Sequence, residues 1–393
     1  MSDSAASGAP LESPAAGRTG DAHGTRLSTR LLAAASRTAA GRALASRAEL
    51  GRIRAASGLL SGAGRSSIAS AQLSANHDAT YRHIWTEAAS AVGASLEEFA
   101  PGYFRFRRGK AETLTWRHHV MLDSPATMTL AGDKALLRHM LAEAGVPVVP
   151  AATANPSGPA DLIAFQAGTA ERLVVKPARG TSGGTGVTCG VQSEDDLIRA
   201  WLVARRHYPV VLGEQQQAGT EYRLLLLGGE LLGAVQRRPA NVTGDGRSSV
   251  RELIAEVNHA RLVGNRHAVS RLIPVNLECM LVLRQAGLTL NSVPADGQVV
   301  LVSASVSASG SEDTETWRQL SPELLASAKL AAEVAHLHLA GVDLVTDDVS
   351  APLEGHGSIL EVNATPGLHY HYQVRQPDEC ERVAVPLLDH LLG

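Results

Sequence analysis

From Leu130 onward, the chain switches repeatedly between helical spacing of apolar residues and short continuous apolar runs. Gly145 and Pro147 mark the end of the first helical stretch. Ser193, Ser249 and Ser321 stand at the predicted N-caps of three later helices. Helices are therefore predicted over 133–147, 193–207, 249–260, 321–339 and 381–392, and strands over 172–177, 209–215, 220–229, 230–239, 341–349 and 357–363.

Helices mixed with mostly antiparallel strand runs predict an α+β fold rather than a regular doubly wound sheet. Upstream, residues 81–99 space Ile84, Ala88 and Val92 like one face of a helix, and residues 102–122 alternate as strands do. We expect residues 76–130 to form a small, reduced N-terminal α/β unit.

Residues 1–75 differ in composition from the rest of the chain. Between Met1 and Ser70 there are nine arginines, no lysine and four acidic residues, amid Ala, Ser and Gly. This low-complexity composition predicts a disordered or weakly helical extension. A helix that docks a partner and an organelle-targeting peptide are the two alternatives.

Composition excludes several classes of protein. With 393 residues, 44% of them hydrophobic, the chain can build two or three structural units. The formal net charge of −3 gives no overall field that would recruit nucleic acid or an anionic membrane. No apolar run reaches 18 residues. The three cysteines are far apart, which argues against a disulfide framework and favours the cytoplasm. A homodimer is the default expectation.

A glycine-rich loop follows the strand that carries Lys176. Glycines let the backbone approach a ligand and aim several N–H groups at it, which suits a polyphosphate. No GK[ST] follows, so this is not a Walker A loop, and a flexible hairpin is the alternative. The loop glycines are Gly180, Gly183, Gly184 and Gly186. Lys134, at the start of the preceding helix, is either an ordinary exposed lysine or a second cation at the same phosphate site.

Acidic and amide side chains follow later strands. Glu221 and Arg223 lie two apart on one strand, so their side chains point to the same face. Such an acid beside an arginine either belongs to a cross-strand ion pair or accepts hydrogen bonds from ribose hydroxyls. Glu361 and Asn363 share one face of their strand. If the strand of Asp343 lies alongside, three oxygen donors converge and suit Mg²⁺. His369 and His371 lack helical ligand spacing, so zinc is disfavoured.

Taken in chain order, these motifs resemble the ATP-grasp ligases, most closely those of the cyanophycin synthetase type. The resemblance covers about Leu130 to His371 and includes the sequences VVKPARGTSGGTGV, RRPANVTGDGRSSVRELI, GVDLV and ILEVNATPG. It implies an ATP-grasp fold in which two α+β subdomains, residues 131–215 and 216–393, clamp ATP.

The resemblance also implies a role for each motif. Lys134 and Lys176 would bind the α- and β-phosphates, and the loop of Gly180, Thr181, Ser182, Gly183, Gly184 and Gly186 would close over the β- and γ-phosphates. Glu214 would lie beside the adenine and Glu221 would bind the ribose. Asp343, Glu361 and Asn363 would hold Mg²⁺, for which Mn²⁺ can substitute. Arg237, or its neighbour Arg238, would face the γ-phosphate.

Two departures from the family pattern change the expectation. Gly341 stands where many ATP-grasp ligases have an arginine, so Arg223 or Arg237 must supply that charge. No Mur-ligase-like half follows Gly393, so alternating polymer extension is not expected. The implied activity joins an amino-acid carboxylate to the amine of an amino acid or short peptide, as in dipeptide or γ-glutamyl ligation. The alternatives are an ATP-grasp phosphotransferase and a catalytically silent nucleotide-binding regulator.

Overall fold

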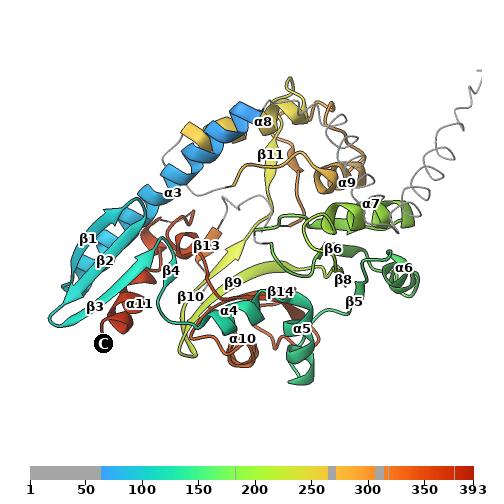
Figure 1. Ribbon diagram of the computed structural model, residues 1–393. Coiled ribbons are helices and arrows are strands. Elements are labelled where there is room, and N and C mark those ends of the chain that lie inside the picture. Colours follow the sequence, from blue (N-terminus) through green and yellow to red (C-terminus); the bar gives the residue numbers. More distant parts are fainter. Residues whose placement is uncertain (1–62, 182, 264–270, 306–313, 317, 376) are drawn as a thin grey trace, which may run out of the picture.

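The computed structural model describes residues 63–393 except 182, 264–270, 306–313, 317 and 376. Most of the predicted N-terminal extension, residues 1–62, lies outside the described residues. Figure 1 shows a mixed α+β molecule with separate antiparallel sheets, which confirms the predicted fold class. In the part of the chain that is described, no helix combines the length and apolarity needed to cross a bilayer.

A five-stranded antiparallel sheet occupies the centre of the molecule (Figure 1). Its strands, in spatial order, are β13 (Thr314–Thr316), β10 (Glu230–Arg237), β9 (Thr220–Leu227), β14 (Leu339–Thr346) and β15 (Gly357–Asn363). Leu224 and Leu226 pack on one side with α10 (Pro322–Val334) and α5 (Lys134–Glu143). Leu225 and Leu227 belong to the core of the N-terminal unit. The period of two then places Glu221 and Arg223 on the same face as Leu225.

A second antiparallel sheet lies beside the first, at the right of Figure 1. Its order is β5 (Ala151–Ala154), β8 (Val211–Gln215), β6 (Leu173–Pro177) and β7 (Thr188–Val191). The helices α6 (Ala160–Ala167) and α7 (Glu194–Ala204) cover it through the buried Leu162 and Trp201. Ser193 caps α7 as predicted, because its side chain accepts a hydrogen bond from the Asp196 amide.

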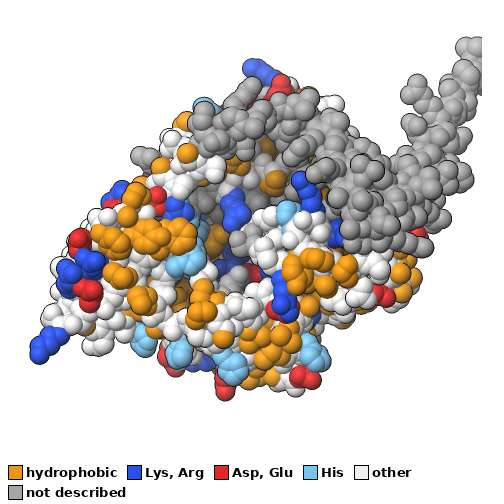
Figure 2. Space-filling view, viewed as in Figure 1, with side chains coloured by type: hydrophobic (Ala, Val, Ile, Leu, Met, Phe, Trp, Pro, Cys, Tyr) orange, Lys and Arg blue, Asp and Glu red, His pale blue; other side chains and the backbone are white. Residues whose placement is uncertain are grey.

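The N-terminal unit pairs a long helix with a small sheet. The helix α3 (Ala63–Val92) ends at Gly93, which has a φ of +68°. The sheet contains β1 (Ser95–Ala100), β2 (Tyr103–Arg108), β3 (Ala111–Trp116) and β4 (His119–Val120). The C-terminal helix α11 (Ala384–Leu391) joins the same core. Figure 2 shows apolar side chains gathered over this sheet, where Phe99, Tyr103 and Trp116 are among the exposed residues.

A small layer of α8 (Val250–Val263), α9 (Leu277–Gln285), β11 (Asn241–Thr243) and β12 (Val299–Leu301) has its own core. Ser249 and Glu252 form the predicted capping box: the Ser249 amide donates to Glu252 Oε2 over 2.8 Å, and the Glu252 amide donates to Ser249 Oγ over 3.4 Å. The remaining elements are α4 (Pro125–Ala131) and the short 3₁₀ turns η2 (Leu368–His371) and η3 (Pro377–Glu379).

Two predicted helical stretches run into residues that form strands. Helical spacing was predicted over 81–99, but α3 ends at Val92 and Ser95–Ala100 form β1. The second is the helix predicted from Ser321. The prediction ran to Leu339, but α10 ends at Val334 and β14 begins at Leu339. His336 has a φ of +54°, which helical residues do not adopt, so the chain reverses there and enters the sheet. Within the described residues the division into 76–130, 131–215 and 216–393 remains a prediction.

Candidate functional site

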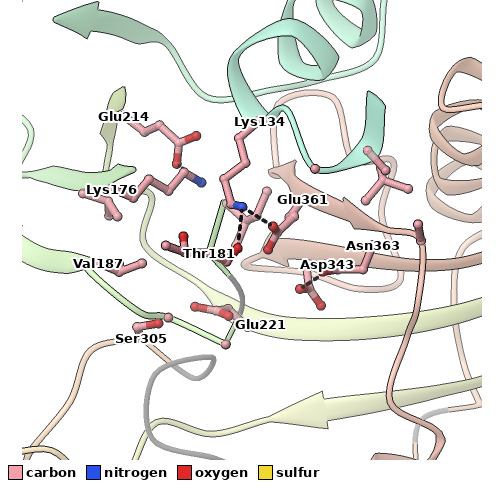
Figure 3. Close-up of a pocket in the computed structure, with 18 of the residues that line it drawn as sticks. Lys134, Lys176, Thr181, Val187, Glu214, Glu221, Ser305, Asp343, Glu361 and Asn363 are labelled. Atoms are coloured by element: carbon pink, nitrogen blue, oxygen red, sulfur yellow. Dashed lines mark hydrogen bonds and ion pairs between the residues drawn. The ribbon is translucent and has the colours of Figure 1, made fainter. Parts of the chain in front are cut away.

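A cavity of about 260 Å³ lies between the two sheets (Figure 3). It receives side chains from α5, from β6 and β8 of the second sheet, and from β9, β14 and β15 of the central sheet. Its walls include Lys134, Lys176, Thr181, Gly183, Gly184, Glu214, Glu221, Asp343, Glu361 and Asn363. The structure thus brings ten of the residues chosen from the sequence to one place.

The other predicted residues lie elsewhere. Gly180 and Gly186 belong to the glycine loop but do not line the cavity. Arg223 and Arg237 lie behind Asp343, and Arg238 lines a different cavity. Ser182 lies outside the described residues.

Lys134 connects the two halves of the cavity. Asp133 caps α5, so Lys134 is the first residue of the helix. The Lys134 amide donates to the Ala178 carbonyl over 3.0 Å, which ties the helix start to the second sheet. Its Nζ lies 3.2 Å from Glu361 Oε1 and donates to the Thr181 carbonyl over 3.3 Å (Figure 3). The ammonium group therefore stands between the glycine loop and the central sheet.

Lys176 and Glu214 form a buried ion pair on the opposite wall. Their strands β6 and β8 are neighbours, and Lys176 Nζ lies 2.7 Å from Glu214 Oε2. Burial alone would raise the pKa of Glu214, but Lys176 and Arg138 outweigh it and hold this pKa below its usual value. Arg138 also contacts the other oxygen of Glu214 and was not identified from the sequence. Its position four residues after Lys134, on the same helix face, was the available signal.

The glycine loop needs glycine at several positions. Gly183 and Gly184 have φ values of +57° and +74°. A β-carbon at Gly183 would lie only 2.1 Å from Cζ of Arg271, so the Arg271 guanidinium packs directly against this part of the loop. Nothing in the local sequence connects Arg271 to a loop almost ninety residues earlier, and the contact emerges only in the fold.

Asp343 lies at the centre of a buried charge cluster. It stands directly opposite Glu361 across β14 and β15, and opposite Arg223 across β14 and β9. Arg223 Nη2 donates to Asp343 Oδ2 over 2.6 Å, and Arg237 Nη1 lies 3.6 Å from Asp343 Oδ1. Burial would raise the pKa of Asp343, but Arg223 and Arg237 hold it below its usual value. The carboxylate therefore stays ionised.

Glu221 differs from the other carboxylates of the cavity. Burial raises its pKa to about 7, the nearby Asp343 adds to this, and Arg237 and Arg223 oppose it. Because this pKa lies near neutral pH, the charge of Glu221 is sensitive to what enters the cavity. A carboxyl group with this pKa can accept hydrogen bonds as an anion or donate one as an acid.

The oxygen donors fit a hard divalent cation. Asp343 and Glu361 face each other in register, and Asn363 Nδ2 donates to Asp343 Oδ2 over 3.2 Å. Two carboxylates and an amide oxygen match the donor chemistry that Mg²⁺ prefers. Among the described residues no group of three or more His, Cys, Asp or Glu side chains is arranged to hold a metal. His369 instead contacts the Tyr81 hydroxyl at 3.0 Å.

Curated proteins show sequence similarity to this chain. It is 33% identical over 246 residues to cyanophycin synthetase from Trichormus variabilis. It is 31% identical over 208 residues to the glutathione biosynthesis bifunctional protein GshAB from Clostridium perfringens. The chain is homologous to a part of each of these proteins. The alignments cover 62% and 51% of this chain but only 27% and 26% of those relatives, and no protein-family model matches.

Two solved structures show a partial likeness to this chain. A bifunctional glutathione synthetase from Pasteurella multocida is 26% identical, with a TM-score of 0.48, over 76% of this chain and 42% of that one. A D-alanine–D-alanine ligase from Bacillus anthracis is 15% identical, with a TM-score of 0.41, over 67% of this chain and 66% of that one.

Gly341 leaves room for an arginine from the neighbouring strand. A β-carbon at Gly341 would lie 2.6 Å from Cβ of Pro366 and 3.3 Å from both Cδ and Nη1 of Arg223. The Arg223 side chain therefore fills the space that a side chain at position 341 would need. The guanidinium expected beside Asp343 comes from the neighbouring strand β9.

Proposed function

We propose that this protein is an ATP-dependent ligase that joins an amino-acid carboxylate to an amine through an acyl-phosphate, releasing ADP and phosphate. The observation that carries the proposal is the cavity that brings Lys134 and Lys176 together with Asp343 and Glu361 of the central sheet. The names of the relatives, a synthetase and a glutathione biosynthesis protein, support ligation of amino acids or short peptides. Dipeptide or γ-glutamyl ligation is the form we favour.

The two lysines would neutralise and position the phosphates. Each is held by a carboxylate now, Lys134 by Glu361 and Lys176 by Glu214, so each ammonium has a fixed place in the cavity. Phosphoryl transfer needs positioning and charge neutralisation more than covalent help. The glycine loop, with its backbone N–H groups, would cover the β- and γ-phosphates and exclude water, to which an acyl-phosphate is sensitive.

The central sheet would bind the metal and the ribose. Asp343, Glu361 and Asn363 would hold Mg²⁺, or Mn²⁺ in its place, and the bound ion would offset the charge of the transferred phosphoryl group. Arg237, held near Asp343, would stabilise the γ-phosphate and the acyl-phosphate. Glu221 would accept the ribose hydroxyls, and Glu214 would border the adenine.

All three cysteines are free, which supports a reducing compartment such as the cytoplasm. Cys189 lines the cavity, and burial raises the pKa of its thiol well above the usual value. A thiol with so high a pKa is a poor nucleophile, so the proposed mechanism uses no covalent enzyme intermediate.

The test combines two measurements on one incubation with ATP, Mg²⁺ and pooled amino acids. A ligase releases phosphate and forms a new amide mass only when donor and amine are both present. Lys176→Met should lower the rate by about 10²–10³-fold, as loss of one electrostatic contact does. Lys110→Met, at an exposed turn, is the matched control.

Asp343→Asn should lower the rate to a similar extent while keeping a polar partner for the buried Arg223. Thermal unfolding of each variant shows whether the fold is kept. Unchanged turnover in either variant refutes the assignment. A phosphorylated product without an amide identifies a phosphotransferase, and neither product identifies a silent nucleotide-binding regulator.

A further inference from the structure

A second cavity of about 460 Å³ lies between β11 and α8, above the central sheet in Figure 1. It shares no lining residue with the cavity between the two sheets. The residues 238–243, which lead into β11 and form it, make one wall. Cavities of this size hold small molecules in many proteins.

One face of α8 forms the opposite wall. The lining residues Leu253, Glu256, Val257, Ala260 and Arg261 follow the spacing of a single helix face. Such a face normally packs fully against its neighbour with apolar side chains. Here Leu253 and Val257 pack in the core of this layer, Arg261 is buried, and Glu256 and Ala260 are exposed beside the cavity. The charged side chains of this face therefore border a cavity that a polar ligand can enter.

The charges of this cavity are arranged for an amino acid. Arg261 is only 2% exposed, and its Nη1 donates to the Arg271 carbonyl, which fixes the side chain in the wall. Arg238 is half-buried on the facing wall. Guanidinium groups bind carboxylates through paired hydrogen bonds. Glu256 can accept hydrogen bonds from an ammonium group, and Leu253 offers an apolar contact.

Two consecutive arginines, Arg237 and Arg238, lie between this cavity and Asp343. Arg237 ends β10 and lies beside Asp343, and the next residue, Arg238, lines the second cavity. Successive side chains of an extended chain point to opposite sides, so the two guanidinium groups serve two places. Asp343, which lines the first cavity, and the second cavity are therefore approached from this same short stretch of backbone.

We propose that the second cavity binds the carboxylate end of a free amino acid or short peptide substrate through Arg238 and Arg261. Glu256 binds the ammonium group when the ligand is a free amino acid. That the ligand is a substrate rests on the proposed ligase function, whereas the binding chemistry does not. Arg238 and Arg261 outnumber Glu256, so the lining is net positive and favours a carboxylate. The negative charge of Glu256 repels inorganic phosphate, which carries no ammonium group.

Binding can be measured without turnover by saturation-transfer NMR on the full chain. Two probes are used, a pool of the twenty proteinogenic amino acids and a pool of alanine-containing dipeptides. At least one component should bind, and its C-terminally amidated form should not. Arg238→Met should raise the dissociation constant about tenfold or more, the usual effect of losing a charged hydrogen-bond partner.

Controls separate this site from the nucleotide site. Arg247→Met, at an exposed position before α8, should change the dissociation constant by less than about twofold, since surface substitutions have small effects. Lys176→Met should weaken ATP binding and keep ligand binding. Equal thermal midpoints for Arg238→Met and the parent protein show that the fold is intact.

Different results would overturn the binding site and the ligase proposal. Absence of binding from both pools, unchanged binding in both Arg238→Met and Glu256→Gln, or preferential binding of inorganic phosphate overturns the inference. If Arg238-dependent binding is present but no ATP-dependent amide forms, the ligase proposal fails and the binding site stands.

Discussion

Glu221 makes the stability of this protein depend on pH in a direction opposite to that of most carboxylates. Its pKa is raised from 4.5 to about 7 by burial, because the charged form is poorly solvated in the cavity wall. Between these two values the native state holds a proton that the unfolded state has lost. The free energy of unfolding therefore falls as pH rises through this window.

The size of the effect follows from the shift. With pKa values of 4.5 in the unfolded chain and about 7 in the native protein, the free energy of unfolding drops by about 2.5 kcal/mol between pH 5 and pH 8. Glu221 is half-buried and faces a cavity, so solvent reduces this figure and we expect about 1–2 kcal/mol. Glu221→Gln removes the titration.

The assay is urea unfolding of the parent protein and of Glu221→Gln at pH 5 and pH 8, without nucleotide. The gain in unfolding free energy from the substitution should be larger at pH 8 by about 1–2 kcal/mol. Glu354→Gln, at an exposed loop position, should show no such difference. An equal effect of Glu221→Gln at both pH values, or a larger gain at pH 5, refutes the reasoning.

Two further substitutions test the packing around the site. Gly341→Ala should cost about 1–3 kcal/mol by overpacking against Pro366, and should lower turnover by displacing Arg223 from Asp343. Urea unfolding and ADP release check both effects, with Gly158→Ala, where no atom lies within 4 Å, as the neutral control. Ser321→Ala should cost about 1–2 kcal/mol, because Ser321 caps α10 and donates to the Ala351 carbonyl over 2.8 Å. Ser327→Ala, within the same helix, should not lower the free energy of unfolding by this amount. An equal loss in both variants would show that the effect of Ser321→Ala does not come from the cap.

Local signals in the sequence were sufficient for most elements. Ser193, Ser249 and Ser321 begin helices where predicted, since an N-cap acts within one turn of the chain. The period of two placed Glu361 and Asn363 on one face of β15 for the same reason. The end of α10 could not be predicted, because helical spacing continues past His336 and only its positive φ interrupts it.

The composition of the cavity between the two sheets was also predictable, because lysines, carboxylates and a glycine loop occur in this order in few kinds of site. The sequence did not predict which of two neighbouring residues faces which cavity. Arg237 and Arg238 are chemically identical neighbours, and only the path of β10 into β11 directs one toward Asp343 and the other toward α8.

The sequence by itself determined most of the elements, the caps and the set of charged residues, since these depend on contacts within a few positions. The tertiary structure alone decided the pairings: Arg138 with Glu214, Arg271 with Gly183, and Arg223 in the space beside Gly341. Each joins segments far apart in the chain, and their proximity follows from how the two sheets pack rather than from any local pattern.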